Sequence, residues 1–244
     1  MKTCLFTGPT LFREPTPPCI SRYGPASLGS VFRAVEGGYR RVGIIDGFFG
    51  NMPSVWHKEI LYAISRGVEV VGAASMGALR AAELWEFGMI GLGRVFRLFR
   101  NGSWTDDDEV AVIHAPEEFD FRPLSDAMAN LRFTLRRLRQ QRLLDRGIEQ
   151  DLIQRMKARH FSERTRGELR QQSIEALGQR AAKRVMDAFD REYIDIKRDD
   201  AQLLVQYLMN KPPQQAPHAR PVFQATGHWR QQFEQQIADV PALR

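Results

Sequence analysis

The chain has 244 residues, a hydrophobic fraction of 43% and a formal net charge of +6 at neutral pH. This length allows one large domain or a core with a helical appendage, and the apolar content excludes a disordered chain. The basic surplus suits an acidic partner, either a nucleic acid or an acidic protein surface, although a solvated helical face would also account for it.

The cysteine content is low, with only Cys4 and Cys19. Neither a CxxC pair nor a Cys/His cluster is present, so we expect no structural zinc, no other metal and no disulfide framework. We see no signal peptide and no uncharged apolar stretch long enough to cross a bilayer. The expectation is a cytoplasmic protein that makes no membrane contact and carries no cofactor.

The first part of the chain alternates short apolar runs with segments of helical spacing. In chain order we expect a strand at 3–7, a proline-rich loop at 11–24, a helix at 28–35, a strand at 41–45, a helix from Ser54 to Gly67, a strand at 68–71, helices at 75–87 and 92–99, and a fourth strand at 110–114. This order predicts a parallel, doubly wound sheet with ligand sites at the carboxyl edge of its strands.

From Leu124 onward only helical spacing recurs. Helices are expected from about Met128, and then at 148–161, 164–177, 180–193 and 199–209. Beyond Lys211, proline and glutamine dominate, which is typical of a mobile tail. The predicted fold class is α/β, a small and mostly parallel sheet with helices plus an all-helical region. The predicted parts are a core at 1–120, the helical region at 121–210 and a Pro/Gln-rich flexible tail at 211–244.

Ser75 is the first candidate catalytic residue. It lies between a predicted strand and a predicted helix, in the turn Gly72-Ala73-Ala74-Ser75-Met76-Gly77-Ala78. A nucleophile elbow needs this arrangement, because a tight turn tolerates only small neighbours and presents the hydroxyl at the sheet edge. The helix start at Met76 and Gly77 offers N–H groups to a developing oxyanion. On the pattern alone, a serine that merely caps the helix is the alternative.

Lys58 is the second candidate, because it is the only lysine between Lys2 and Lys157. It falls near the start of the helix after the second strand, at the same sheet edge as Ser75. A neutral lysine amine can accept a serine proton, and the positive end of a helix dipole disfavours the ammonium form. Arginine cannot replace it, since arginine does not lose its proton in proteins. The alternative is an exposed lysine paired with a carboxylate such as Glu59.

Four further residues are candidates for binding substrate at this edge. Asp46 ends the second strand and would orient Lys58 or contact substrate, unless it is only a turn residue. Gly8 and Thr10 follow the first strand and would supply backbone or hydroxyl donors. Arg80 lies one turn into the Ser75 helix and would meet a substrate carboxylate, with an ion pair to Glu83 as the alternative.

The loop Asp106-Asp107-Asp108-Glu109 is the strongest acidic cluster in the sequence. A divalent cation or a basic partner would suit it, but it lacks the ordered spacing of a calcium loop, so we predict no metal site there. His114 follows on the expected fourth strand, where a structural role is the simpler interpretation.

Several segments together carry a family likeness. They are Trp56-His57-Lys58-Glu59-Ile60-Leu61, the block Gly72 to Leu84, Phe87-Gly88-Met89 with Gly91, Asp107 to Val112, and Tyr193 to Ala201. This pattern resembles the TfuA family over roughly residues 3 to 209. The resemblance implies an accessory protein with a hydrolase-like active site that works beside a YcaO enzyme, which activates peptide backbone amides with ATP and installs thioamides in a precursor peptide or protein.

The resemblance also implies a reaction and its partners. A TfuA protein is expected to bind a ThiS-like, ubiquitin-fold sulfur carrier and to hydrolyse its C-terminal thiocarboxylate, which releases sulfide for YcaO. The family's Ser-Lys pair would correspond to Ser75 and Lys58 in this sequence. Arg80 and other basic residues would steer the anionic thiocarboxylate, and the arginine-rich helical region would dock the carrier or YcaO.

Two alternatives remain open at the level of the sequence. The first is a non-catalytic adaptor that holds YcaO and its peptide substrate, with Ser75 only capping a helix. The second is a nucleic-acid binder, suggested by the basic helices and marked by salt-dependent affinity. No recognised nucleic-acid-binding motif supports the second alternative.

Overall fold

The structure is a computed structural model that describes residues 1–50, 52–210, 212 and 222–236. It divides into two compact units, Met1–Thr105 with Arg198–Arg244, and Asp106–Lys197. These boundaries differ from the predicted ones at residues 120 and 210. The acidic loop belongs to the second unit, and most of the last long helix, α9 (Ile196–Asn210), belongs to the first.

The first unit is built on a five-stranded sheet in which every pairing is parallel, with the order β2-β1-β3-β4-β5. The strands are β1 (Thr3–Phe6), β2 (Ser21–Tyr23), β3 (Arg41–Ile44), β4 (Glu69–Gly72) and β5 (Ile90–Gly91). The α/β fold class predicted from the sequence is therefore confirmed. The central strands β1, β3 and β4 are buried throughout, as expected for a parallel sheet that is covered on both faces.

Two strands were missed by the sequence prediction and one was wrongly expected. Strand β2 lies inside the proline-rich loop, and β5 has only two residues, too few for a periodic signal. The expected strand at 110–114 does not form. In this part of the described chain the β-pairing of His114 is an isolated antiparallel bridge to Pro123, and its Nδ1 lies 2.8 Å from the carbonyl oxygen of Ala115.

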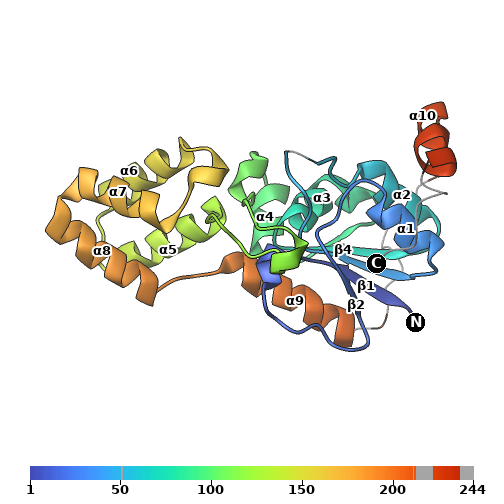
Figure 1. The fold of residues 1–244 in the computed structure, drawn as a ribbon, viewed down its shortest axis with the longest axis horizontal. Helices are drawn as coiled ribbons and strands as arrows, with labels where there is room; N and C mark the ends of the chain where they lie inside the picture. Colours follow the sequence, from blue (N-terminus) through green and yellow to red (C-terminus); the bar gives the residue numbers. More distant parts are fainter. Residues whose placement is uncertain (51, 211, 213–221, 237–244) are drawn as a thin grey trace. The chain divides into compact units, whose positions relative to one another are not determined.

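Helices cover both faces of the sheet (Figure 1). One face carries α1 (Ser30–Glu36), α2 (His57–Ser65) and α3 (Met76–Leu84), while α9 lies on the other. Leu204 and Leu208 of α9 pack with Leu5 and Val71 of the sheet. A short amphipathic helix, α4 (Gly93–Arg100), follows β5.

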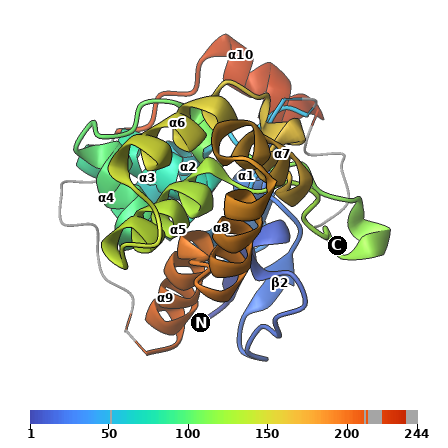
Figure 2. The same cartoon turned by 90° about the vertical axis from the view of Figure 1, so that its left-hand side faces the viewer.

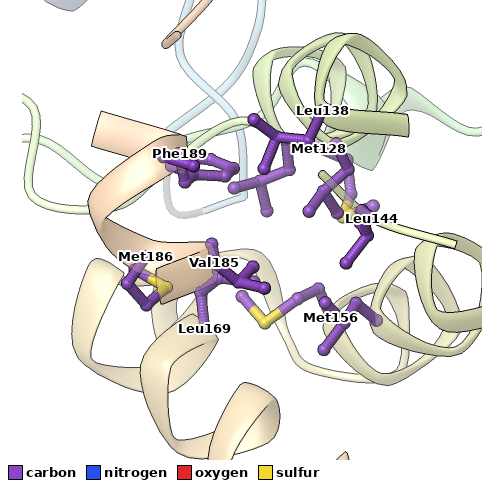
Figure 3. Packing of buried hydrophobic residues seen from close by; sticks show 12 residues of the cluster. Met128, Leu138, Leu144, Met156, Leu169, Val185, Met186 and Phe189 are labelled. Carbon is purple, nitrogen blue, oxygen red and sulfur yellow. The ribbon is translucent and has the colours of Figure 1, made fainter. Parts of the chain in front are cut away.

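The second unit is all-helical, as predicted. Its main helices are α5 (Met128–Gln140), α6 (Arg146–Lys157), α7 (Arg166–Leu177) and α8 (Gln179–Arg191) (Figure 2). Leucine, methionine and phenylalanine side chains from all four helices meet in one apolar core, which includes Leu138, Met156, Leu169 and Phe189 (Figure 3). This core gives residues 106–197 a hydrophobic centre of their own.

The family-like segment Tyr193 to Ala201 serves the packing of the chain. In the second unit, Lys197 Nζ donates to the carbonyl of Val110 at 2.7 Å, and Asn130 Nδ2 donates to Asp195 at 2.9 Å. In the first unit, the Asp200 carboxylate accepts the N–H groups of Arg94 and Val95, at 2.9 and 2.8 Å, and so caps α4. In this segment the residues that resemble the family therefore form hydrogen bonds that hold the fold together.

Within the described residues, no helix combines the length and the apolar character that a membrane crossing requires.

The approach of α3 to the sheet gives a first prediction. A Cβ added at Gly77 would lie 1.8 Å from the carbonyl oxygen of Ile44, whereas one added at Gly147 would meet nothing within 4 Å. Gly77→Ala should therefore lower the free energy of unfolding by more than about 3 kcal/mol, because backbone has to move. Gly147→Ala, the control, should change it by less than about 1 kcal/mol. Urea denaturation measures both, and a Gly77→Ala protein as stable as the wild type would contradict the packing.

Candidate active site

Ser75 lies where β4 gives way to α3, as the sequence predicted. Ala74 has φ of 68°, in the left-handed region, and the Ser75 N–H donates to the carbonyl of Ala73 at 2.8 Å. The Ser75 carbonyl then accepts the N–H groups of Ala78 and Leu79 and starts the helix. A left-handed alanine is strained, and such strain is concentrated at functional sites. Ser75 is also well covered, with 2% of its surface exposed.

The backbone donors of this turn are partly used by the fold. The N–H of Gly77 donates to the carbonyl of Ile45 at 3.1 Å, which removes Gly77 as an oxyanion donor in this conformation. The side chain of Met76 is buried against Gly47, where an added Cβ would lie 2.7 Å from Met76 Cγ. The Met76 N–H is thus the candidate donor that remains from the predicted pair.

Asp46, Gly8 and Thr10 come together at the carboxyl edge of the sheet, as predicted. The Asp46 carboxylate accepts the N–H of Gly8 at 2.9 Å, the N–H of Thr10 at 3.1 Å and the Thr10 hydroxyl at 2.6 Å. Asp46 is 2% exposed and thereby fixes the turn after β1. Asp46 therefore has the geometry of a turn residue, which was the alternative to a role in substrate binding. The donors of Gly8 and Thr10 that would contact a substrate are bonded to Asp46 instead.

Lys58 lies in the first turn of α2, which begins after β3 near the carboxyl edge. Its Nζ donates to the Thr226 hydroxyl at 3.0 Å and lies 5.8 Å from the centre of the Phe223 ring. The structure therefore directs the Lys58 amine to the C-terminal segment, defined here as residues 222–233, and does not pair it with the Ser75 hydroxyl. Neither of these two contacts was visible in the sequence.

The C-terminal segment overlaps the predicted flexible tail. Of that tail, residues 211, 213–221 and 237–244 lie outside the described residues, but the C-terminal segment is placed against α1 and α2. Trp229 and Phe233 are 1% and 0% exposed, and their rings stack at 4.1 Å between centres. Burial of side chains of this size contributes roughly 1.5–3 kcal/mol each. The aromatic residues among the prolines and glutamines indicate a packed segment, and the sequence prediction did not use them.

Arg80 connects the starts of α2 and α3. Its Nη1 donates to Glu83 at 2.7 Å, and its Nε donates to the carbonyl of Val55 at 3.1 Å. Glu83 also lies 2.8 Å from His57 Nε2. Burial of Glu83 opposes its ionisation, but the hydrogen bond from His57 and the charge of Arg80 outweigh it and hold its pKa below the usual range. Arg80 thus forms the ion pair that was the alternative to a substrate contact.

The acidic loop is neutralised from within the second unit. Asp106, Asp108 and Glu109 present oxygens within 4.8 Å of one another, which is close enough to hold a cation. The Lys157 ammonium occupies that position, at 3.2 Å from Asp106 and 3.0 Å from Glu109, with Asp108 also bound. Although burial opposes ionisation, Lys157 and Arg164 together keep the pKa of Asp108 low. In this structure the loop is therefore an ion-pair cluster around the Lys157 ammonium.

Glu59 is a buried acid next to the candidate lysine. One of its oxygens accepts the N–H groups of Val31 and Phe32 at the start of α1, at 3.2 and 3.3 Å. The other accepts the Trp56 N–H at 3.1 Å and caps α2. Burial raises the pKa of Glu59 to about 7, although the backbone bonds partly offset this effect. The sequence prediction considered Glu59 only as a partner for Lys58.

The fold and the Ser75 turn define an α/β protein whose candidate site lies at the carboxyl edge of a parallel sheet. Residues 46–165 match the model of the TfuA-like protein family. The match confirms the resemblance to the TfuA family over these residues, which include Lys58, Ser75 and the acidic loop. Gly8, Thr10 and the C-terminal segment lie outside the matched region. A search of curated proteins finds no match.

The Glu59 carboxyl gives a second prediction. Its pKa rises from 4.5 to about 7 on folding, so the folded chain binds more protons between these values. The stability that protonated Glu59 contributes is complete below about pH 4.5 and is lost as the pH rises through about 7. Glu59→Gln should remove a slope of up to about 1.4 kcal/mol per pH unit from urea denaturation series. Glu86→Gln, at an exposed position, should keep the slope, and an unchanged slope in Glu59→Gln would contradict the assignment.

Proposed function

We propose that this protein is an accessory factor for YcaO-dependent thioamidation of a peptide backbone. In this role it hydrolyses the thiocarboxylated C-terminus of a ThiS-like sulfur carrier and delivers sulfide to the YcaO enzyme. The observation that carries the proposal is the placement of Ser75. It lies in a strained turn at the start of α3, at the carboxyl edge of the sheet and inside the segment that matches the family.

The reaction is a two-step acyl transfer. Lys58, as the neutral amine, takes the proton of the Ser75 hydroxyl, and the oxygen attacks the thiocarboxylate carbon. The tetrahedral oxyanion is held by the Met76 N–H at the helix start. The C–S bond breaks, hydrosulfide leaves with the proton returned by Lys58, and the carrier remains as an ester on Ser75. Water then hydrolyses the ester, which restores Ser75 and leaves a carboxylate on the carrier.

Two features of the described conformation have to change for this reaction. Ser75 has only 2% of its surface exposed, and the Lys58 amine is bonded to Thr226. The described conformation therefore corresponds to a resting state, in which Ser75 is covered and the Lys58 amine is bonded elsewhere. A movement that uncovers Ser75 and releases Lys58 belongs to the proposed mechanism, as is common for enzymes that close over their substrates.

The charge distribution supports docking of an anionic carrier by the first unit. Lysine and arginine outnumber aspartate and glutamate by six in residues 1–105 with 198–244, and the two signs balance in residues 106–197. The expectation that the arginine-rich helical region docks the carrier is not supported by this balance. An anionic thiocarboxylate tail would be attracted to the unit that contains Ser75.

The proposed nucleophile gives a third prediction. Ser75→Ala should reduce sulfide release from a ubiquitin-fold carrier thiocarboxylate by at least about 100-fold, because no acyl-enzyme forms. Lys58→Arg should cause a comparable loss, since arginine keeps the charge but cannot accept the proton. Ser103→Ala, at an exposed serine of the first unit, is the matched control and should retain full activity. Sulfide is measured by a colorimetric assay and the carrier by mass spectrometry.

The burial of Ser75 and the bond from Lys58 to Thr226 favour one other function, a non-catalytic adaptor that holds YcaO and its peptide substrate. In that case Ser75 only begins α3. Two results together would support the adaptor and contradict the hydrolase. Wild type and Ser75→Ala would release sulfide equally, and both proteins would bind YcaO normally.

A further inference from the structure

The surface around Lys58 is covered by the chain's own C-terminal segment. The face beneath consists of Phe32 of α1 with Trp56 and Tyr62 at the start and middle of α2. Onto it Trp229 places its ring edge-on to Phe32, at 5.7 Å between centres, and at 5.3 Å from Tyr62. The C-terminal segment thus covers this face through apolar contacts between aromatic rings, on two short helices.

The same segment also engages the amine of Lys58. Thr226 accepts the hydrogen bond from Lys58 Nζ, and the Phe223 ring lies beside the ammonium at 5.8 Å. His228 stacks on Trp56, at 5.3 Å between centres, next to the first residue of α2. Trp229 and Phe233 are the buried side chains of this segment, and they anchor it to the face beneath. The contacts with the Lys58 amine therefore depend on these two rings staying in place.

We infer that the C-terminal segment is a latch, which occupies an interaction surface on α1 and α2 and holds Lys58 away from Ser75. The partner that fits this surface is a peptide segment with aromatic side chains, which replaces Trp229 and Phe233 and leaves the Lys58 amine free. The catalytic meaning of the latch rests on the proposed function. The latch itself does not rest on the proposed function, because it concerns only the position of the Lys58 amine.

Amine labelling of the full-length protein tests the latch directly. Acetic anhydride at low concentration acetylates accessible neutral amines, and mass spectrometry of peptides gives a rate for each lysine. Trp229→Ala removes the central ring and should raise the labelling rate of Lys58 about 3- to 10-fold, as expected for loss of one hydrogen bond and its cover. Phe87→Ala, which removes a half-exposed ring elsewhere in the first unit, is the matched control and should leave the rate unchanged.

Two other groups serve as references in the same experiment. The Cys4 thiol in β1 is 0% exposed and reports on the fold of the first unit, so it should stay protected from iodoacetamide, while Lys183 is exposed and gives the reference rate of acetylation. Thr226→Val keeps the rings and removes the hydroxyl that accepts from Lys58 and, at 3.3 Å, from the Trp229 N–H, and it replaces Trp229→Ala if Cys4 becomes reactive in that variant. The latch is refuted when Lys58 labels at the wild-type rate in a variant whose Cys4 remains protected.

The carrier assay separates this inference from the proposed function. Faster Lys58 labelling in Trp229→Ala, with faster sulfide release that still requires Ser75, supports both. Faster labelling without sulfide release from any variant upholds the latch and refutes the hydrolase. Unchanged labelling, with Ser75-dependent release equal in wild type and Trp229→Ala, refutes the latch and leaves the hydrolase standing.

Peptide binding tests the partner chemistry. A synthetic, fluorescently labelled peptide of residues 222–236 is added to full-length wild-type protein and to Trp229→Ala. Binding at least about 10-fold tighter to Trp229→Ala is expected, because the vacated face accepts the rings in trans. A peptide in which tryptophan and both phenylalanines are replaced by alanine should not bind. Equal affinity of the two peptides would show that the surface does not select aromatic side chains.

Discussion

The close approach of α3 to the central strands is the constraint on which the candidate site depends. Gly72 and Gly77 face each other so closely that an added Cβ at Gly72 would lie 2.0 Å from the Gly77 carbonyl oxygen. The bond from Gly77 N–H to the Ile45 carbonyl fixes the helix at the end of β3 as well as β4. With both ends of the turn held, Ala74 takes a left-handed conformation and Ser75 is placed at the edge of the sheet.

Several charged residues that look functional in the sequence turn out to complete the fold. Asp46 caps the turn after β1, Asp200 caps α4, and Lys157 neutralises the acidic loop. Each of these groups is partly or fully buried with its partners, which is how a charged side chain is accommodated inside a protein. Asp200 belongs to one of the family-like segments, and its contacts show that this position serves the fold.

Much of this architecture could be predicted from the sequence, and the failures have physical causes. Apolar runs and helical spacing located β1, β3, β4 and every long helix to within a few residues. Strand β2 was missed because it pairs only at the sheet edge inside a proline-rich stretch. The partner of Lys58 was missed because Thr226 is 168 residues away along the chain, and no local pattern records such a contact. The placement of Ser75 was predicted, whereas its coverage depends on packing that a linear pattern does not contain.

The shared carboxyl of Glu59 has a mechanical consequence for the two helices that it joins. Because one side chain binds the starts of both α1 and α2, neither helix can shift without straining the bonds of the other. The N–H groups of Phe32 and Trp56, one in each helix start, are bonded to this same carboxylate. A partner that displaces the first turn of α2 would therefore also load the bonds at the start of α1.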